Sequence, residues 1–110
     1  TPKTILMKSA RDRDTNVAYN VACNPNVPRE ALTILAERRN IGILVAVVRN
    51  KNTPEEALAK LARNNNRNLR LLIAEHENTS RETLEFLLLK AVKEADQKLA
   101  ETVRLALAKQ

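Results

Sequence analysis

The chain has 110 residues and a formal net charge of +6, which fits one compact domain or one short solenoid and permits an acidic partner such as nucleic acid. Only Tyr19 and Phe86 are aromatic, and the single glycine and four prolines argue against an all-β fold, whose many turns need such residues. There is no run of membrane-spanning length and no secretory signal pattern, so we expect no membrane partner, and the single cysteine, Cys23, excludes an internal disulfide framework and fits a cytoplasmic location.

Residues of the same kind recur every 26 positions along the whole chain. The helix-start pair Thr53-Pro54 is preceded at this spacing by Val27-Pro28 and Thr1-Pro2, and is followed by Thr79-Ser80. Four further columns are Leu6, Leu32, Leu58 and Leu84; Val17, Ile43, Leu69 and Ala95; Val21, Val47, Ile73 and Leu99; and Asn26, Asn52 and Asn78. A fixed period of this size is typical of solenoids. The sequence therefore predicts one all-α domain over 1–110, with repeats at 1–16, 17–42, 43–68 and 69–94 and a C-terminal cap at 95–110.

The first helix is expected over residues 1–10, which match 53–62 in register. The chain would then begin in mid-repeat, at the second helix of a pair. The apolar face of that helix, with Ile5, Leu6 and Ser9, would lack an upstream partner, so we expect self-association through this open end. A polar loop over 11–16 leads to the next predicted segment, 17–24.

The central part of the chain is predicted to be helical over 29–38 and again over 41–48. Gly42 is a candidate for a left-handed or otherwise permissive turn between them. Residues 41–48 are nearly all apolar and could be a buried strand by composition alone. A helix is predicted instead, because the equivalent residues 17–22 and 69–74 lie between helices and a repeat unit must keep one structure throughout.

Thr53 gives the strongest predicted helix start. The run Thr-Pro-Glu-Glu places a hydroxyl at the N-cap, proline at the first helical position and Glu56 three residues in, which is the pattern of a capping box. Thr79 repeats this logic, whereas Val27 lacks the hydroxyl and should cap more weakly. The sequence predicts that Val27→Thr stabilises the fold.

The C-terminal third carries few stop signals. A polar loop over 64–68 and a segment over 69–76 are followed by a predicted helix over 83–91, and in register Ala95, Leu99 and Ala100 begin another. Residues 92–94 contain no glycine, proline or asparagine. The pattern is compatible with one bent long helix or with two helices separated by a minimal break.

The segment from Asn24 to Leu32, NPNVPREAL, followed by Leu35-Ala36, resembles the leucine-rich repeat variant family of bacterial α-solenoids. Residues 52–62 match the motif again, and 78–84 match it more weakly. The resemblance implies a right-handed superhelix with short or 3₁₀-like first segments. The very apolar first segments of this chain depart from that pattern and suggest ordinary helices, nearer to HEAT-type pairs. The family's founding architecture also carries a cysteine-ligated iron–sulfur cluster, which a chain with Cys23 alone does not match, so no cofactor is expected.

Catalytic chemistry has few candidate residues in this sequence. Cys23 and His76 are each unique and would lie about two repeats apart, too far for a nucleophile–base pair. Cys23 is interpreted as a small packing residue at a helix end, and His76 as a polar cap at a helix C-terminus. One histidine and one cysteine do not make a metal site, and Glu55-Glu56 suit a helix start better than a catalytic dyad. We therefore expect no enzyme activity.

One further group of residues could form a site, and its members are arginines. The predicted loops after the second helix of each pair, and the residues just beyond them, would stack basic side chains along one edge: Arg11, Arg13, Arg38, Arg39, Arg63, Arg67 and Arg70. This edge is open to two interpretations. It is either a solvated edge whose cations complement helix C-termini, or a candidate binding edge for phosphates or acidic groups.

Three functions follow from the sequence. The leading expectation is a non-enzymatic scaffold that binds a protein or peptide through an extended repeat surface. The second is a nucleic-acid-binding array that uses the arginine edge, although stacking aromatics are absent. The third is a structural or designed repeat without a natural ligand.

Overall fold

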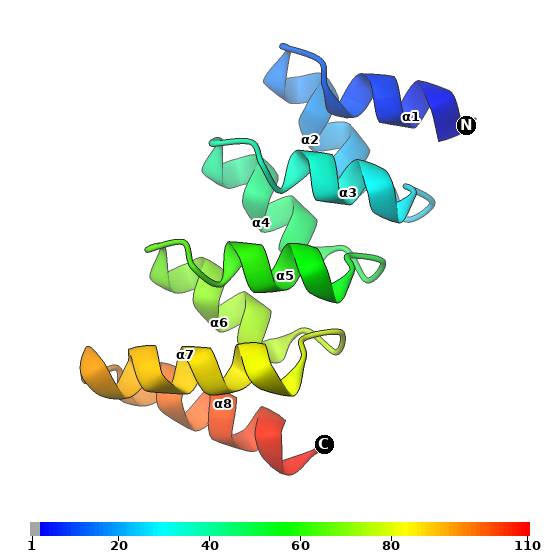
Figure 1. Ribbon diagram of the computed structural model, residues 1–110. Helices are drawn as coiled ribbons and strands as arrows, with labels where there is room; N and C mark the ends of the chain where they lie inside the picture. Colours follow the sequence, from blue (N-terminus) through cyan, green and yellow to red (C-terminus); the bar gives the residue numbers. More distant parts are fainter. Residues whose placement is uncertain (1–2) are drawn as a thin grey trace.

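The computed structural model describes residues 3–110, which form eight α-helices and contain no strand in that range (Figure 1). The helices are α1 (Lys3–Ala10), α2 (Thr15–Cys23), α3 (Arg29–Leu35), α4 (Ile41–Arg49), α5 (Glu55–Leu61), α6 (Arg67–Glu75), α7 (Arg81–Lys93) and α8 (Gln97–Ala108). The all-α prediction is confirmed. The predicted helix start at Thr1-Pro2 lies outside the described residues.

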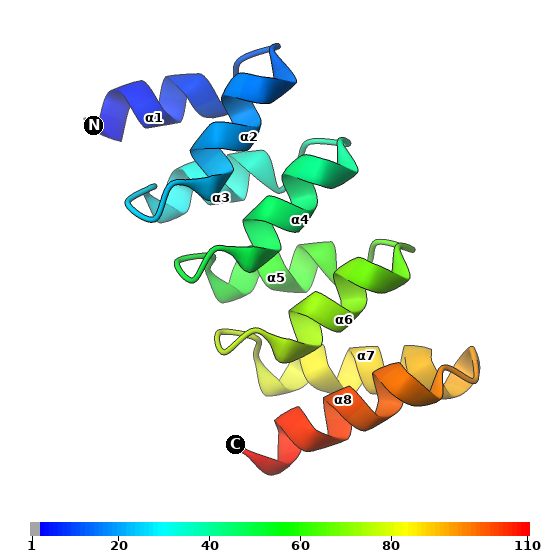
Figure 2. The same ribbon diagram turned by 180° about the vertical axis from the view of Figure 1, so that it is seen from behind.

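The helices lie in two layers, with α1, α3, α5 and α7 on one side and α2, α4, α6 and α8 on the other (Figures 1 and 2). Within the second layer α2 packs on α4, α4 on α6 and α6 on α8. The molecule measures 41 × 24 × 15 Å along its principal axes. The connections after α1, α3, α5 and α7 all fall at one edge of the layers, and those after α2, α4 and α6 at the opposite edge.

Equivalent helices in the first three pairs start 26 residues apart: α2, α4 and α6 at 15, 41 and 67, and α3, α5 and α7 at 29, 55 and 81. The caps recur with them. Asn40 accepts from the Ile43 amide at 3.2 Å, and Asn66 accepts from the Leu69 amide at 3.1 Å. A capping side chain at this position satisfies an amide that the helix itself leaves unpaired.

The apolar segment after Asn40 is helical, as α4, and the strand alternative is wrong. Gly42 is not the turn that the sequence suggested, because it lies inside α4 with ordinary helical backbone. A Cβ at this position would approach Asn40 Oδ1 to 3.1 Å. The glycine therefore leaves room for the cap rather than for a left-handed turn.

The break between α7 and α8 is a short turn, so of the two predicted alternatives the pair of helices is confirmed. Ala95 adopts a φ of 55°, the left-handed conformation. The Asp96 amide donates to the Ala91 carbonyl at 2.8 Å and the Ala95 amide to the Val92 carbonyl at 3.2 Å. This bonding pattern is a Schellman motif, which ends a helix without needing proline or glycine in the sequence.

The last helix pair departs from the 26-residue spacing. Helix α7 has 13 residues where α5 has 7, so the cap Asp96 comes 30 residues after its counterpart Asn66. The predicted equivalence of Ala95 with Leu69 is therefore wrong. Ala95 is an exposed turn residue, and Leu99 takes the buried place that Leu69 holds in α6.

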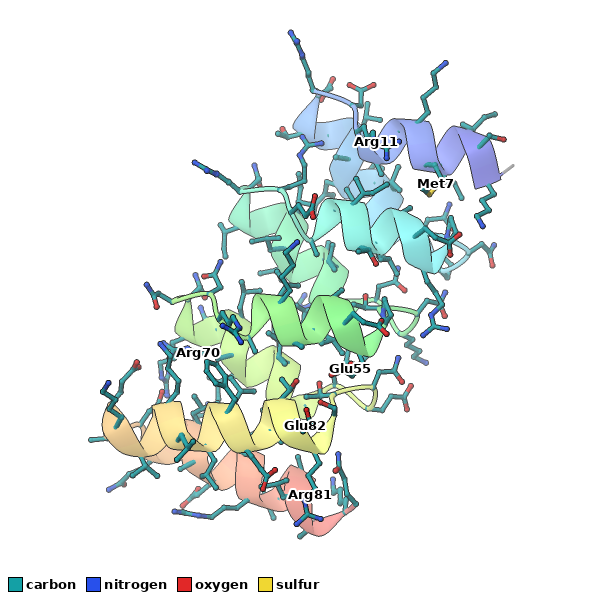
Figure 3. The ribbon with its side chains drawn as sticks, in the orientation of Figure 1. Met7, Arg11, Glu55, Arg70, Arg81 and Glu82 are labelled. Carbon is teal, nitrogen blue, oxygen red and sulfur yellow. The ribbon has the colours of Figure 1, made fainter. Side chains whose placement is uncertain are left out.

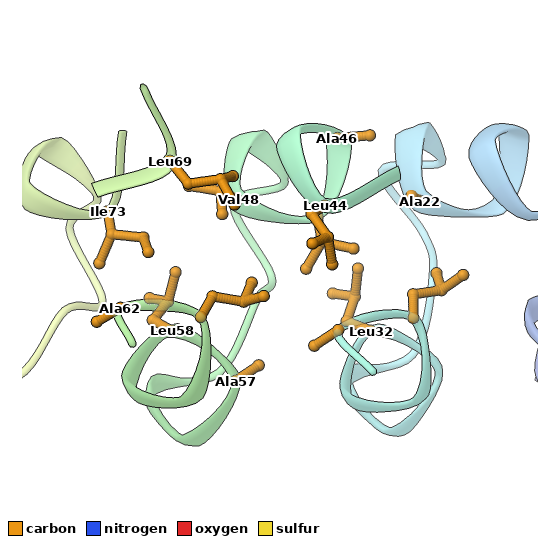
Figure 4. Close-up of a cluster of buried hydrophobic side chains, with 14 of the residues drawn as sticks. Ala22, Leu32, Leu44, Ala46, Val48, Ala57, Leu58, Ala62, Leu69 and Ile73 are labelled. Carbon is orange, nitrogen blue, oxygen red and sulfur yellow. The ribbon is translucent and has the colours of Figure 1, made fainter. Parts of the chain in front are cut away.

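The core lies between the two layers and is built almost entirely from leucine, isoleucine, valine and alanine (Figure 4). Leu32, Leu58 and Leu84 are at most 1% exposed, as the repeat predicts. Leu44 and Ile73 reach toward Leu32 and Leu58 from the other layer. Alanines such as Ala62 allow helices to approach closely, so aliphatic side chains fill the space without aromatic rings.

The turns after α2, α4 and α6, at 24–28, 50–54 and 76–80, form the turn edge, where side-chain amides tie neighbouring pairs together. Asn50 is 9% exposed, and its Nδ2 donates to the carbonyls of Ala22 at 2.8 Å and Asn24 at 3.1 Å. Asn52 Nδ2 donates to the Pro25 carbonyl at 2.7 Å. The asparagine column is thus a set of bonds between successive turns.

The predicted capping box at Thr53 is wrong. Helix α5 has Pro54 at its N-cap with no side-chain cap bond, and Thr53 is buried with its hydroxyl donating to the carbonyl of Val47 near the end of α4. Thr79 makes the same bond to Ile73, and Ser80 caps α7 instead. Val27, at the equivalent place, is buried and has no hydroxyl to donate.

Candidate functional site

The predicted arginines lie at or beside one edge of the molecule, which we call the loop edge and define by the connections 11–14, 36–40 and 62–66 (Figure 1). Their side chains do not form a uniform exposed ladder, however. Arg11, Arg13, Arg39, Arg63 and Arg67 are exposed, whereas Arg38 is half-buried and Arg70 is buried.

Several of these arginines are bound to other parts of the chain. Arg38 Nη1 donates to the carbonyls of Ala10 at 3.1 Å and Asp12 at 2.8 Å, just where α1 ends. The Arg63 guanidinium lies 5.7 Å from the centre of the Phe86 ring, within cation–π range. Both side chains join one helix pair to the next, and Arg38 matches the interpretation of cations at helix C-termini.

Arg67 and Arg70 hold the α7–α8 turn against α6. Arg67 donates to Asp96 through Nε at 2.6 Å and Nη2 at 3.1 Å. Arg70 lies 3.1 Å from Glu94 Oε1, and its Nη2 donates to the Asn65 carbonyl at 3.1 Å. Its side chain is 6% exposed, so the prediction that Arg70 extends a binding edge is wrong.

The ion pair between Arg67 and Asp96 shifts the pKa of both side chains. The hydrogen bond from Arg67, together with the Leu99 amide that Asp96 caps, lowers the pKa of the Asp96 carboxyl. The same hydrogen bond raises the pKa of Arg67. Both groups are then charged at neutral pH and committed to each other. The exposed arginines of the loop edge without an ion pair among the described residues are Arg11, Arg13, Arg39 and Arg63, and of these Arg63 lies against the Phe86 ring.

The residues considered for catalysis lie apart from one another, and each has a structural role in its own helix. His76 is the C-cap of α6: its Nδ1 accepts from the Asn78 amide at 3.0 Å, and its Nε2 donates to the Asn50 carbonyl at 2.9 Å. Glu55 lies in the first turn of α5, as Glu82 does in α7 (Figure 3). Within 3–110 no three histidine, cysteine, aspartate or glutamate side chains gather as a metal site would require.

Cys23 ends α2, as predicted, but its side chain is exposed rather than packed. Its thiol lies near Tyr19 one turn earlier, and this neighbour, more than any other, raises the pKa of the tyrosine. The nearby charge of Arg49 acts in the opposite direction. Tyr19, Cys23 and Arg49 are therefore close neighbours on the surface of α2 and α4.

These residues belong to a surface that the sequence reasoning missed. The fifth residues of α2, α4 and α6 are Tyr19, Val45 and Leu71. We call this column the apolar face, and its Val45 and Leu71 also pack against the core. Tyr19 is 46% exposed, and the other two are half-buried. The signal was present in the sequence, since this column is apolar in three successive copies although it lies outside the fully buried columns.

A groove of about 490 Å³ opens beside this column between α2 and α4. Tyr19, Val45 and Ala46 form much of its apolar lining, and the turn edge closes one end. Arg49 and Lys51 are its charged lining residues, and no carboxylate lines it. Neither cation forms an ion pair with another described residue.

No protein-family model, no curated protein and no solved structure matches this chain. Among the helices of residues 3–110, none has the length and apolar character that crossing a membrane requires.

Proposed function

We propose that the protein is a non-enzymatic scaffold that binds a protein or peptide on the apolar face. One observation carries this proposal: Tyr19, Val45 and Leu71 repeat at the same place on three stacked helices, where Tyr19 is exposed and the other two are half-buried, whereas the inward columns are buried. A row of accessible apolar side chains on rigid helices suits an elongated partner. The absence of convergent catalytic groups at this face fits the same function.

The proposal includes a finer description of the fold, a right-handed α-solenoid with a 26-residue period. The equal spacing of helix starts in the first three pairs supports it, as does the sense in which the chain passes between the two layers in Figures 1 and 2. The resemblance of the turn motifs to the leucine-rich repeat variant family supports it as well. Because the first segments are nine-residue α-helices, the pairs are nearer to HEAT-type units. A cytoplasmic location is part of the proposal.

Nucleic-acid binding at the loop edge is the second candidate, supported by the exposure of Arg11, Arg13 and Arg39. It is the weaker of the two, because Arg38, Arg63, Arg67 and Arg70 are engaged within the chain. Binding of duplex DNA or RNA that weakens steeply with salt, and that the triple change of the three exposed arginines to alanine removes, would establish it.

Self-association through α1 stays a prediction. Ile5 is 53% exposed, while Ala31 and Ala57 at the equivalent places of α3 and α5 are buried. Leu6, expected to share the uncovered face, is 5% exposed and belongs to the core. Sedimentation of wild type and of Ile5→Lys over a range of concentrations measures this association directly.

The main proposal is tested by selecting binders from an unbiased displayed peptide library on the intact chain. Selected peptides are then titrated against wild type, against Leu71→Glu on the apolar face, and against Thr33→Glu on the exposed surface of α3 as a matched control. We expect the first substitution to abolish binding and the second to leave it unchanged. A library that yields no binder, or binders indifferent to Leu71→Glu, contradicts the proposal.

A further inference from the structure

We propose that the α2–α4 groove captures an acidic peptide segment, with one large apolar side chain of that segment seated against Val45 and Ala46. This inference rests on the proposed scaffold function and adds the chemical class of the partner. It follows from the lining of the groove, which combines an apolar floor with cations at one end.

The floor of the groove is shaped by small residues. Gly42 and Ala46 on α4 face Ala22 and Cys23 on α2, so the two helices leave a hollow of about 490 Å³. Tyr19 also lines it. A hollow of this size accepts a leucine- or phenylalanine-sized side chain together with part of the backbone that carries it, and burying that side chain would supply most of the attraction.

The charge of the groove selects among apolar segments. Arg49 and Lys51 line it without ion-pair partners, and its lining contains no acid. The chain as a whole carries +6, so long-range attraction acts in the same direction as the two local cations. A segment with glutamate or aspartate next to its apolar residue gains from both, whereas a basic segment is repelled.

The neighbouring groove between α6 and α8 lacks this selectivity. Its lining includes Glu75 and Glu77 together with Lys98 and Lys109. Glu75 occupies the place on α6 that Arg49 occupies on α4, so the charge at the equivalent position is reversed. Of these two grooves, the one between α2 and α4 is therefore the one whose lining favours an acidic ligand.

The experiment uses labelled synthetic peptides with a central leucine flanked by glutamates, and two comparison peptides. In one comparison peptide lysines replace the glutamates, and in the other serine replaces the leucine. We expect the acidic leucine peptide to bind, and both comparison peptides to bind at least about tenfold more weakly. Equal binding of the serine peptide would show non-specific charge attraction and overturn the proposal.

Charge-reversal variants locate the site. Arg49→Glu and Lys51→Glu should each weaken the acidic peptide about tenfold and strengthen the lysine peptide. Arg81→Glu, at the start of α7 in the other layer (Figure 3), changes the net charge equally and should leave both affinities nearly unchanged. An equal loss of affinity for the acidic peptide in all three variants overturns the assignment of the binding site to this groove.

Cys23 offers an independent readout, because it is the only cysteine and lies in the groove lining. Saturating acidic peptide should slow alkylation of its thiol, and the reference variant Cys23→Ala/Thr33→Cys, with the thiol moved to α3, should show no protection. Unprotected Cys23 under a bound peptide overturns the inference while leaving the scaffold function standing. Failure of every library peptide to bind overturns both.

Discussion

The hydroxyls of Thr53 and Thr79 act on the helix that precedes each turn rather than on the helix that follows. Each is buried and donates to a carbonyl in the last turn of the preceding helix, Val47 in α4 and Ile73 in α6. Each of these carbonyls also accepts the amide of the cap residue, Asn50 or His76, at 3.1 Å, so the hydroxyl is a second donor at the end of the helix. Threonine is therefore useful at this position through a bond over six residues, although its spacing to Glu56 imitates a capping box.

Thr53→Val should destabilise the protein by about 1 kcal/mol, because the shape is kept and one buried hydrogen bond is lost. Val27→Thr should stabilise it by a similar amount, with the new hydroxyl donating to Val21. Glu56→Gln is the control, since Glu56 is exposed and makes no cap bond. Urea unfolding measures all three. A larger loss of stability in Glu56→Gln than in Thr53→Val would support the capping box instead.

Ala95 holds the left-handed conformation at the end of α7. A side chain in this conformation meets the following carbonyl, which glycine avoids. We expect Ala95→Gly to raise the free energy of unfolding by about 0.5–1 kcal/mol, after allowing for the greater freedom of glycine in the unfolded chain. Thermal melts compare it with Ala59→Gly inside α5, which should lower stability. If both substitutions destabilise the protein, the left-handed conformation assigned to Ala95 is contradicted.

At the scale of elements, α7 and α8 form the most extensive helix–helix contact and are held to α6 by two arginines. The extra residues of α7 carry Glu94 and Asp96 to the positions where Arg70 and Arg67 meet them. The bidentate Arg67–Asp96 pair has the geometry that makes such contacts specific. Because Asp96 also caps α8, one carboxylate fixes the start of the last helix and its place against α6.

The low pKa of Asp96 links this junction to pH. A carboxyl whose pKa is lower in the folded state contributes stability above its unfolded pKa, and this contribution is lost as pH falls through the folded value. Asp96→Asn keeps an oxygen for the Leu99 amide but removes the charge. We expect wild type to be the more stable protein at neutral pH and the difference to shrink in strong acid, as followed by urea unfolding. A difference independent of pH would contradict the ion pair.

An element could be predicted from the sequence when the interactions that form it are periodic along the chain, and could not when they join distant residues. Helices α2 to α6 and the burial of Leu58 follow from periodic apolar columns, which are visible along the chain. The buried Arg70 and the α7 extension depend on contacts between residues more than twenty positions apart, such as Arg70 with Glu94. A column of arginines shows where cations recur, but whether each meets solvent, a carbonyl or a carboxylate is decided by tertiary packing.

The whole molecule presents two unlike surfaces. The layer of α3 and α5 shows charged groups such as Glu37 and Lys60, which pair with each other at 2.8 Å. The layer of α2, α4 and α6 shows the apolar face and the α2–α4 groove. Since the helices behind both surfaces share one core, the difference arises from the outward residues alone. In that groove the two lining cations, Arg49 and Lys51, have no ion-pair partner among the described residues.

The most direct test of the binding-scaffold account is an amide chemical-shift map of the intact chain titrated with a peptide selected from the unbiased library. The account predicts that the perturbed amides centre on Tyr19, Val45 and Leu71 in α2, α4 and α6, with little change in α3 and α5. Perturbations centred on the loop edge at Arg11, Arg13 and Arg39, with the apolar face unchanged, would contradict it.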